Sequence, residues 1–97
     1  MVLTVDDIEK QVAGNAIVRM MMGQAIRQLK DAEKKIGTEP LKILFLGKRK
    51  LDKKEYAEAA KRFGSKGLMS IETMEHLTIP QKQYLFRQMG WDEKEVV

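Results

Sequence analysis

The residues best suited to a chemical task are positively charged and lie in the middle of the chain. Residues 42–66 contain nine Lys and Arg against three Asp and Glu, whereas residues 1–41 hold six of each and residues 67–97 hold three and five. A local excess of cations favours contacts with phosphate groups. The middle segment therefore predicts a nucleic-acid-binding surface. The alternative interpretation is a solvated face whose charges only keep the protein in solution.

These cations occur in two groups that a binding surface must bring together. The first is the run KRKLDKK after Gly47, and the second surrounds the letters KRFGSK. Contacts of this type set affinity without reading base sequence. We expect a nucleic-acid partner, DNA more than RNA, and the predicted binding residues are Lys48, Arg49, Lys50, Lys53, Lys54, Lys61, Arg62, Ser65 and Lys66.

A second candidate surface is apolar. Met20, Met21 and Met22 belong to the stretch AIVRMMM, which is apolar nearly all round except at Arg19. Methionine side chains repack around different partners, although in an apolar helix they more often form a core or a dimer seam. Trp91 either packs the C-terminus onto the core or anchors a partner. The alternative function is thus an adaptor or inhibitor module, of the kind mobile elements encode, that binds a protein or a second copy.

Catalysis and metal binding have little support in the sequence. The chain has no Cys and one His, and His76 lies four residues after Glu72. Zinc needs three or four protein ligands, so this pair does not make a site. No nucleophile has an obvious base, and no glycine-rich phosphate loop of the Walker or dinucleotide type is present. We expect neither an enzyme nor a metal or cofactor.

The expected location is cytoplasmic, without membrane contact. Asp6 and Asp7 stand where a secretory signal needs a basic start, and no apolar run approaches the length of a membrane span. The absence of Cys permits a reducing compartment.

Helix start signals recur and predict an all-α fold. A short oxygen-bearing side chain followed three residues later by Asp, Glu or Gln forms a capping box. With 97 residues, 43% of them apolar, we expect one helical domain over residues 1–97, built from about five helices. The pairs are Thr4 with Asp7, Asp52 with Glu55, and Thr78 with Gln81.

The first helix is expected to be long, from about Val5 to Lys35, because two apolar stripes run through it. Gly14 and Gly23 each weaken it, so a break or a close contact with another helix is expected at either position. The second, from Glu39 to about Gly47, contains ILFL, which periodicity alone leaves open between a helix and a buried strand.

The other helix starts order the rest of the chain. The spacing Thr38-x-Pro40 favours a helix for the ILFL segment, because proline suits a first helical turn. Asp52 opens the third helix, and Gly64 and Gly67 bracket a tight turn after it. Ser70 is expected to cap a short fourth helix through Leu77, and Thr78 to cap a fifth that runs to Met89.

The residues AEAAKRFGSKG at 57–67 resemble the helix-turn-helix superfamily. Ala60 and Gly64 have the spacing of the family's small residue in the first helix and its glycine in the turn, and the turn is one residue shorter than usual. The resemblance, which extends over residues 57–77, implies a DNA-binding regulator. Positions near Ser65, Lys66, Ser70 and Thr73 would then face DNA.

The same letters also fit FGxxGxxI, the pattern of the phosphate-clamping loop of KH domains. Phe63, Gly64, Gly67 and Ile71 have that spacing. A KH fold needs strands beside its helix pair, and Thr78 begins a predicted helix where the next strand belongs. We therefore favour the helix-turn-helix interpretation.

Overall fold

The computed structural model describes residues 3–97, and these residues form helices and no strand, which confirms the predicted all-α class. The strands that a KH fold needs are therefore missing from this part of the chain. No helix within it is long and apolar enough to cross a bilayer. The elements are α1 (Val5–Gly14), α2 (Ala16–Ile36), α3 (Thr38–Leu46), α4 (Lys53–Phe63), α5 (Ser65–Thr73) and α6 (Ile79–Met89), with short 3-10 helices η1 (Met74–His76) and η2 (Glu93–Glu95).

The described chain divides into two compact units, and the boundary between them falls within α2. One unit, here called the terminal unit, contains residues 3–27 and 77–97. The other, here called the central unit, contains Gln28–His76. The prediction of a single domain over residues 1–97 stays a prediction.

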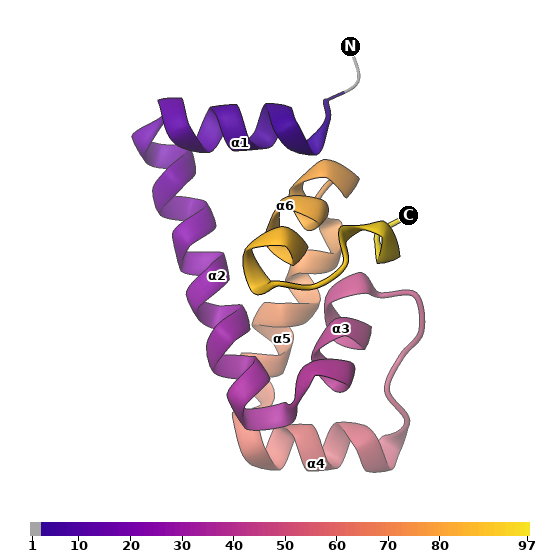
Figure 1. The fold of residues 1–97 in the computed structure, drawn as a ribbon. Coiled ribbons are helices and arrows are strands. Elements are labelled where there is room, and N and C mark those ends of the chain that lie inside the picture. The colour runs from indigo at the N-terminus through magenta and orange to yellow at the C-terminus, as the bar shows by residue number, and fades with distance from the viewer. Residues whose placement is uncertain (1–2) are drawn as a thin grey trace. The chain divides into compact units, whose positions relative to one another are not determined.

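In the terminal unit α1 contacts α6, and α6 contacts η2 (Figure 1). Tyr84, Leu85 and Phe86 of α6 are buried, as is Ile8 of α1. Gly90 ends α6 in the left-handed conformation, and the Trp91 ring then meets Phe86 edge-on, with ring centroids 5.1 Å apart. The tryptophan thus packs within its own unit.

The single helix predicted from Val5 to Lys35 is in fact two helices, because Asn15 interrupts it. The Asn15 backbone is extended, with φ −137° and ψ 113°. Its Oδ1 accepts hydrogen bonds from the N–H groups of Ile17 at 2.9 Å and Val18 at 3.2 Å, as an N-cap does. Figure 1 shows the corner between α1 and α2 at this point. Gly23, the other expected break, lies inside an unbroken α2.

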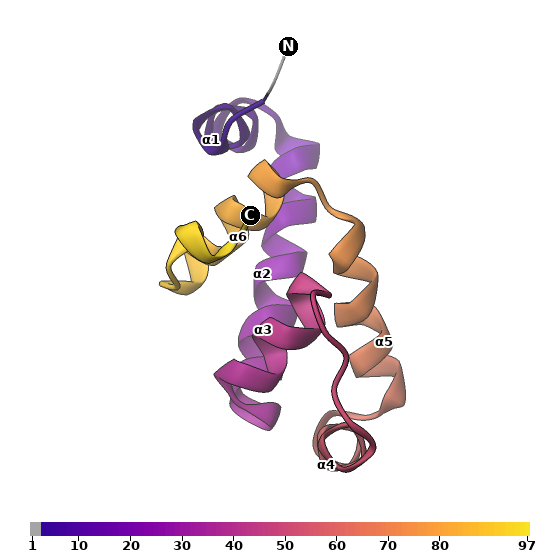
Figure 2. The same ribbon diagram turned by 90° about the vertical axis from the view of Figure 1, so that its right-hand side faces the viewer.

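In the central unit α5 packs against both α3 and α4 (Figure 2). Leu41, Leu44 and Phe45 of α3 and Leu68 and Ile71 of α5 are buried. The ILFL segment is therefore helical, and Gly47 stops it in the left-handed conformation, with φ 69°.

The turn between α4 and α5 is Gly64 alone. Its φ of 82° and ψ of 151° lie in a region that essentially only glycine enters, and it caps both helices. Because α5 already begins at Ser65, the prediction that Ser70 caps a helix is wrong. The Ser70 hydroxyl instead donates to the carbonyl of Lys66 at 3.1 Å. Gly67 lies inside α5, where an added Cβ would come within 2.6 Å of the Phe63 ring.

The predicted capping boxes are all present. Thr4, Asp52 and Thr78 each accept from the N–H group three residues ahead, and the side chain there accepts from the cap's own N–H. Thr38 differs. The cap of α3 is Gly37, without a side-chain hydrogen bond, and the Thr38 hydroxyl donates to Glu33 at 3.0 Å.

Candidate nucleic-acid interface

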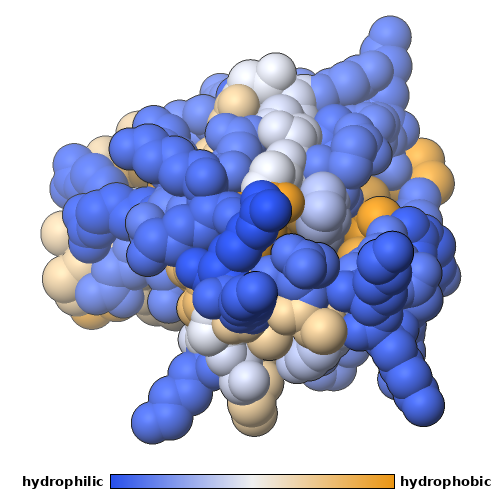
Figure 3. All heavy atoms as spheres, turned by 90° about the horizontal axis from the view of Figure 1, so that it is seen from below, coloured by the Kyte–Doolittle hydropathy of each residue, from blue (hydrophilic) through white to orange (hydrophobic). Residues whose placement is uncertain are grey.

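The predicted nucleic-acid-binding residues all lie in the central unit, on α4 and on the segments at its two ends. Figure 3 looks at the face that carries α4, and hydrophilic side chains cover most of it. Lys48, Arg49 and Lys50 lie in the loop at 47–52 before α4. Lys53, Lys54, Lys61 and Arg62 lie in the first and last turns of α4, and Ser65 and Lys66 begin α5.

Five of these lysines, here called the open lysines, form no ion pair with any residue of the described chain 3–97. Their side chains are exposed to solvent. An exposed ammonium without an acidic partner is free to neutralise a phosphate. The open lysines are Lys50, Lys53, Lys54, Lys61 and Lys66.

Arg49, in contrast, is held by an acidic neighbour. Its Nη1 and Nη2 donate to the two carboxylate oxygens of Glu55 at 3.2 and 3.3 Å. Glu55 Oε1 also accepts from the backbone N–H of Asp52 at 3.0 Å. The hydrogen bonds from Arg49 first, and from Asp52 second, hold the pKa of the Glu55 carboxyl below its ordinary value. Arg49, one of the predicted nucleic-acid-binding residues, is therefore already paired with a carboxylate in this structure.

This lowered pKa predicts an acid-sensitive start of α4. A group whose pKa is lower in the folded chain stabilises the fold above its unfolded pKa, and the stabilisation disappears as pH falls through the folded pKa. We expect wild type to be more stable than Glu55→Gln at neutral pH, and the difference to shrink below about pH 5. Urea unfolding of both proteins across this pH range measures it, and a difference independent of pH would contradict the expectation.

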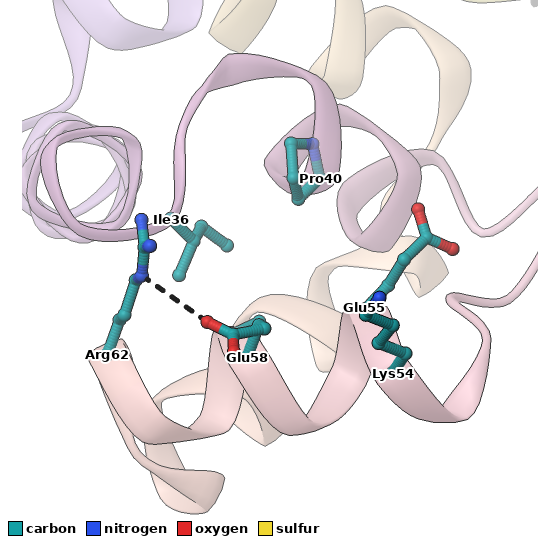
Figure 4. A pocket seen from close by; sticks show the side chains of 7 residues that line it. Ile36, Pro40, Lys54, Glu55, Glu58 and Arg62 are labelled. Carbon is teal, nitrogen blue, oxygen red and sulfur yellow. Dashed lines mark ion pairs between the residues drawn. The ribbon is translucent and has the colours of Figure 1, made fainter.

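Arg62 is likewise turned toward an acid. Its Nε lies 3.9 Å from Glu58 Oε2, one helical turn earlier (Figure 4). The two residues lie at the rim of a hollow of ≈ 320 Å³ between α4 and the start of α3. Ile36, Pro40 and Ala59 give this hollow an apolar lining. Arg62 therefore contributes less free positive charge than its position in the sequence suggests.

The side of the 47–52 loop toward α5 and η1 carries negative charge. Glu72 and Glu75 line a second hollow there, of ≈ 420 Å³, together with Tyr56 and the loop. The Glu75 carboxylate lies so close to Gly47 that a Cβ at that position would be 2.6 Å from Oε2. Arg49 and Lys50 line the same hollow, so the two glutamates lie beside these loop cations. Lys53, Lys54, Lys61 and Lys66 do not line it, and phosphate contacts are expected chiefly there.

The predicted apolar interface lies in the other unit, and the structure separates its members. Met20 and Met21 are 58% and 62% exposed, whereas Met22 is 8% exposed. Ile17, which sequence analysis did not single out, is 65% exposed and lies on the same side of α2, at helical spacing from Met20 and Met21. Trp91 is half-buried against Phe86.

Arg87 is the centre of a cluster of charged side chains that the sequence analysis did not identify. From α6 it contacts Glu93 of η2, with Nε to Oε1 at 2.7 Å and Nη2 to Oε2 at 2.9 Å. Its Nη1 donates to Glu9 at 2.6 Å and to Asp6 at 3.3 Å, both on α1. The hydrogen bonds to Glu93 and Glu9 raise the pKa of the guanidinium. Arg87 and its partners on α1 are about 80 positions apart in the sequence, so no local spacing pattern predicts that they meet.

The arrangement of exposed cations can neutralise a polyanion. Its distinguishing feature is a set of exposed ammonium groups at the two ends of α4, next to the ion pairs Arg49–Glu55 and Arg62–Glu58. Comparison of this chain with protein-family models, with curated proteins and with solved structures found no match.

Proposed function

We propose that this chain is a small nucleic-acid-binding protein, a DNA-binding regulator that holds phosphates on α4 and its flanking segments. The observation that carries the proposal is the set of open lysines on one helix and its two ends. Lysine ammonium groups release condensed counterions when they neutralise phosphates, which supplies affinity independent of base sequence. Two of the three acidic side chains in segment 42–66, those of Glu55 and Glu58, pair with Arg49 and Arg62, and the third, Asp52, caps α4.

The start of α5 adds donors to the same surface. Gly64 provides no side-chain hydrogen bond to the first N–H groups of α5, so these donors remain available beside Ser65 and Lys66. Backbone donors and the helix dipole both favour a phosphate at such a position. The elbow between α4 and α5 thus supports phosphate contacts at one end of the surface.

The salt dependence of binding tests this proposal. With the open lysines each neutralising one phosphate, the log–log slope of affinity against salt is expected to be about −4.5 on duplex DNA. Affinity should then fall about 500-fold between about 50 and 200 mM salt. Fluorescence anisotropy of a labelled mixed-sequence duplex measures it. Binding without salt dependence, or no binding at low salt, would contradict the proposal.

A second candidate function is a protein-binding adaptor that uses Ile17, Met20 and Met21. Their exposure favours a partner-binding surface. A single exposed apolar side chain is common on protein surfaces, whereas a cluster of them is less common. No Asp or Glu occurs between Lys10 and Lys30, and Arg19 and Arg27 are exposed there. A second copy would bring like charges together, so the fitting partner is an amphipathic helix with carboxylates beside its apolar face.

Model peptides test this candidate. A synthetic helix with leucines on one face and flanking glutamates is expected to bind, and the same peptide with lysines in place of the glutamates is not. Met21→Glu should remove the binding, because it places a charge within the apolar cluster. Charge reversal of Lys48, Arg49 and Lys50 should leave it intact. Equal binding of both peptides, or binding of neither, would count against an acidic partner.

A further inference from the structure

The open lysines are grouped at the two ends of α4. Lys50, Lys53 and Lys54 lie at its start, and Lys61 and Lys66 lie at its end and just beyond the Gly64 elbow. The helix has 11 residues, which at 1.5 Å per residue makes it about 16 Å long. Lys54 and Lys61 are seven residues apart, so the two groups are separated by about 11 Å along the helix axis.

Between the two groups the outer face of α4 carries one polar side chain, the exposed Glu58. Lys54, Ala57 and Lys61 follow each other at spacings of three and four residues, so they share one face. Ala57 is exposed and has no side-chain hydrogen-bonding atom. Glu58, beside it, is turned to Arg62. With Ala57 at its centre this face can approach a groove closely, and the ion pair with Arg62 occupies the Glu58 carboxylate in the free protein.

The surface also lacks the aromatic side chains on which single-stranded bases stack. The aromatic residues of segment 42–66 are Phe45, Tyr56 and Phe63, and none is exposed. Phe45 is fully buried. The Phe63 ring has Lys35 Nζ 5.5 Å from its centroid, and Gly67 packs against it. Single-strand-binding proteins gain affinity from stacking on such rings, so this surface is poorly built for single strands.

We propose that α4 lies across the major groove of duplex DNA and bridges the two phosphate backbones that border it. The inference rests on the proposed function and deepens it. The major groove of B-DNA is about 12 Å wide and the minor groove about 6 Å, so lysines about 11 Å apart along the helix axis match the wider groove. Lys50, Lys53 and Lys54 contact one backbone, and Lys61 and Lys66 contact the other, with Ala57 over the groove.

The test compares three ligands of the same length and sequence at fixed salt by fluorescence anisotropy: duplex DNA, one of its single strands, and the RNA duplex. We expect the DNA duplex to bind at least about 10-fold more tightly than either, because the single strand lacks stacking partners and the RNA major groove is narrow and deep. Phosphate ethylation interference on the DNA duplex should then mark both strands, on either side of one major groove.

A matched pair of variants distinguishes bridging from simple attraction. Lys53→Gln with Lys54→Gln removes charge from one end, and Lys61→Gln with Lys66→Gln removes the same charge from the other. Each pair should reduce the salt slope by about 1.8 and erase ethylation interference on one strand only, a different strand for each pair.

The outcomes separate the inference from the proposed function. Equal affinity for the single strand or the RNA duplex overturns duplex bridging while nucleic-acid binding stands. Interference confined to one strand, or the same footprint lost in both variant pairs, also overturns bridging. No binding to any of the three ligands overturns both proposals together.

Discussion

Replacing all the open lysines with glutamine is expected to lower the affinity for duplex DNA by about 1,000-fold at about 50 mM salt. The salt slope should fall toward zero, because each lost lysine removes about 0.9 from it. Anisotropy titrations at several salt concentrations measure both quantities. The substituted side chains are exposed and unpaired in the described chain, so the fold should be unaffected, which far-UV circular dichroism checks.

The control is a variant with the same net charge. Glutamine at an equal number of exposed or half-exposed lysines elsewhere lowers the formal charge of +4 by the same amount. If the surface on α4 matters, this control keeps most of its affinity and slope. Equal losses in both variants would show that total charge, and no particular surface, attracts DNA. The control positions are Lys10, Lys30, Lys34, Lys82 and Lys94.

The same substitution, glycine to alanine, should have opposite effects at two positions. Gly64→Ala is expected to lower the free energy of unfolding by about 1–3 kcal/mol, because alanine rarely adopts the backbone angles of Gly64. Gly23→Ala should raise it by about 1 kcal/mol, because Gly23 lies inside α2 and an added Cβ there meets no atom within 4 Å.

Urea unfolding followed by circular dichroism measures both changes. A destabilised Gly23→Ala would mean that α2 needs its glycine for a reason other than backbone freedom. An unchanged Gly64→Ala would mean that the elbow relaxes without loss. In that case the position of Lys66 relative to α4 would depend little on Gly64, and DNA binding of this variant should equal that of wild type.

The charge surface was largely predictable from sequence because its members are close together along the chain. The run KRKLDKK and the letters KRFGSK flank one helix whose start is marked by the Asp52 and Glu55 pair. Local capping chemistry needs only neighbouring residues, which is why Thr4, Asp52 and Thr78 were located correctly. Whether the surface binds DNA stays a prediction.

The errors arose where local signals competed. Gly14 and Gly23 both weaken a helix, yet the break occurs at Asn15. The side-chain oxygen of Asn15 accepts hydrogen bonds from two N–H groups at the start of α2, which have no partner within the helix. Ser70 resembles a cap by type, but Gly64 alone completes the turn, so the next helix starts earlier and the Ser70 hydroxyl bonds within it.

By itself the sequence determined the helical class, the helix starts with capping boxes and the basic middle segment, because propensity, capping and charge act over a few residues. Only the tertiary structure decided which cations stay unpaired, which methionines face solvent and where Arg87 finds its acids. Arg49 meets Glu55 because the loop before α4 folds back, and Arg87 meets Asp6 and Glu9 because α1 packs against α6. Such pairings depend on distances in space, which a one-dimensional pattern does not contain.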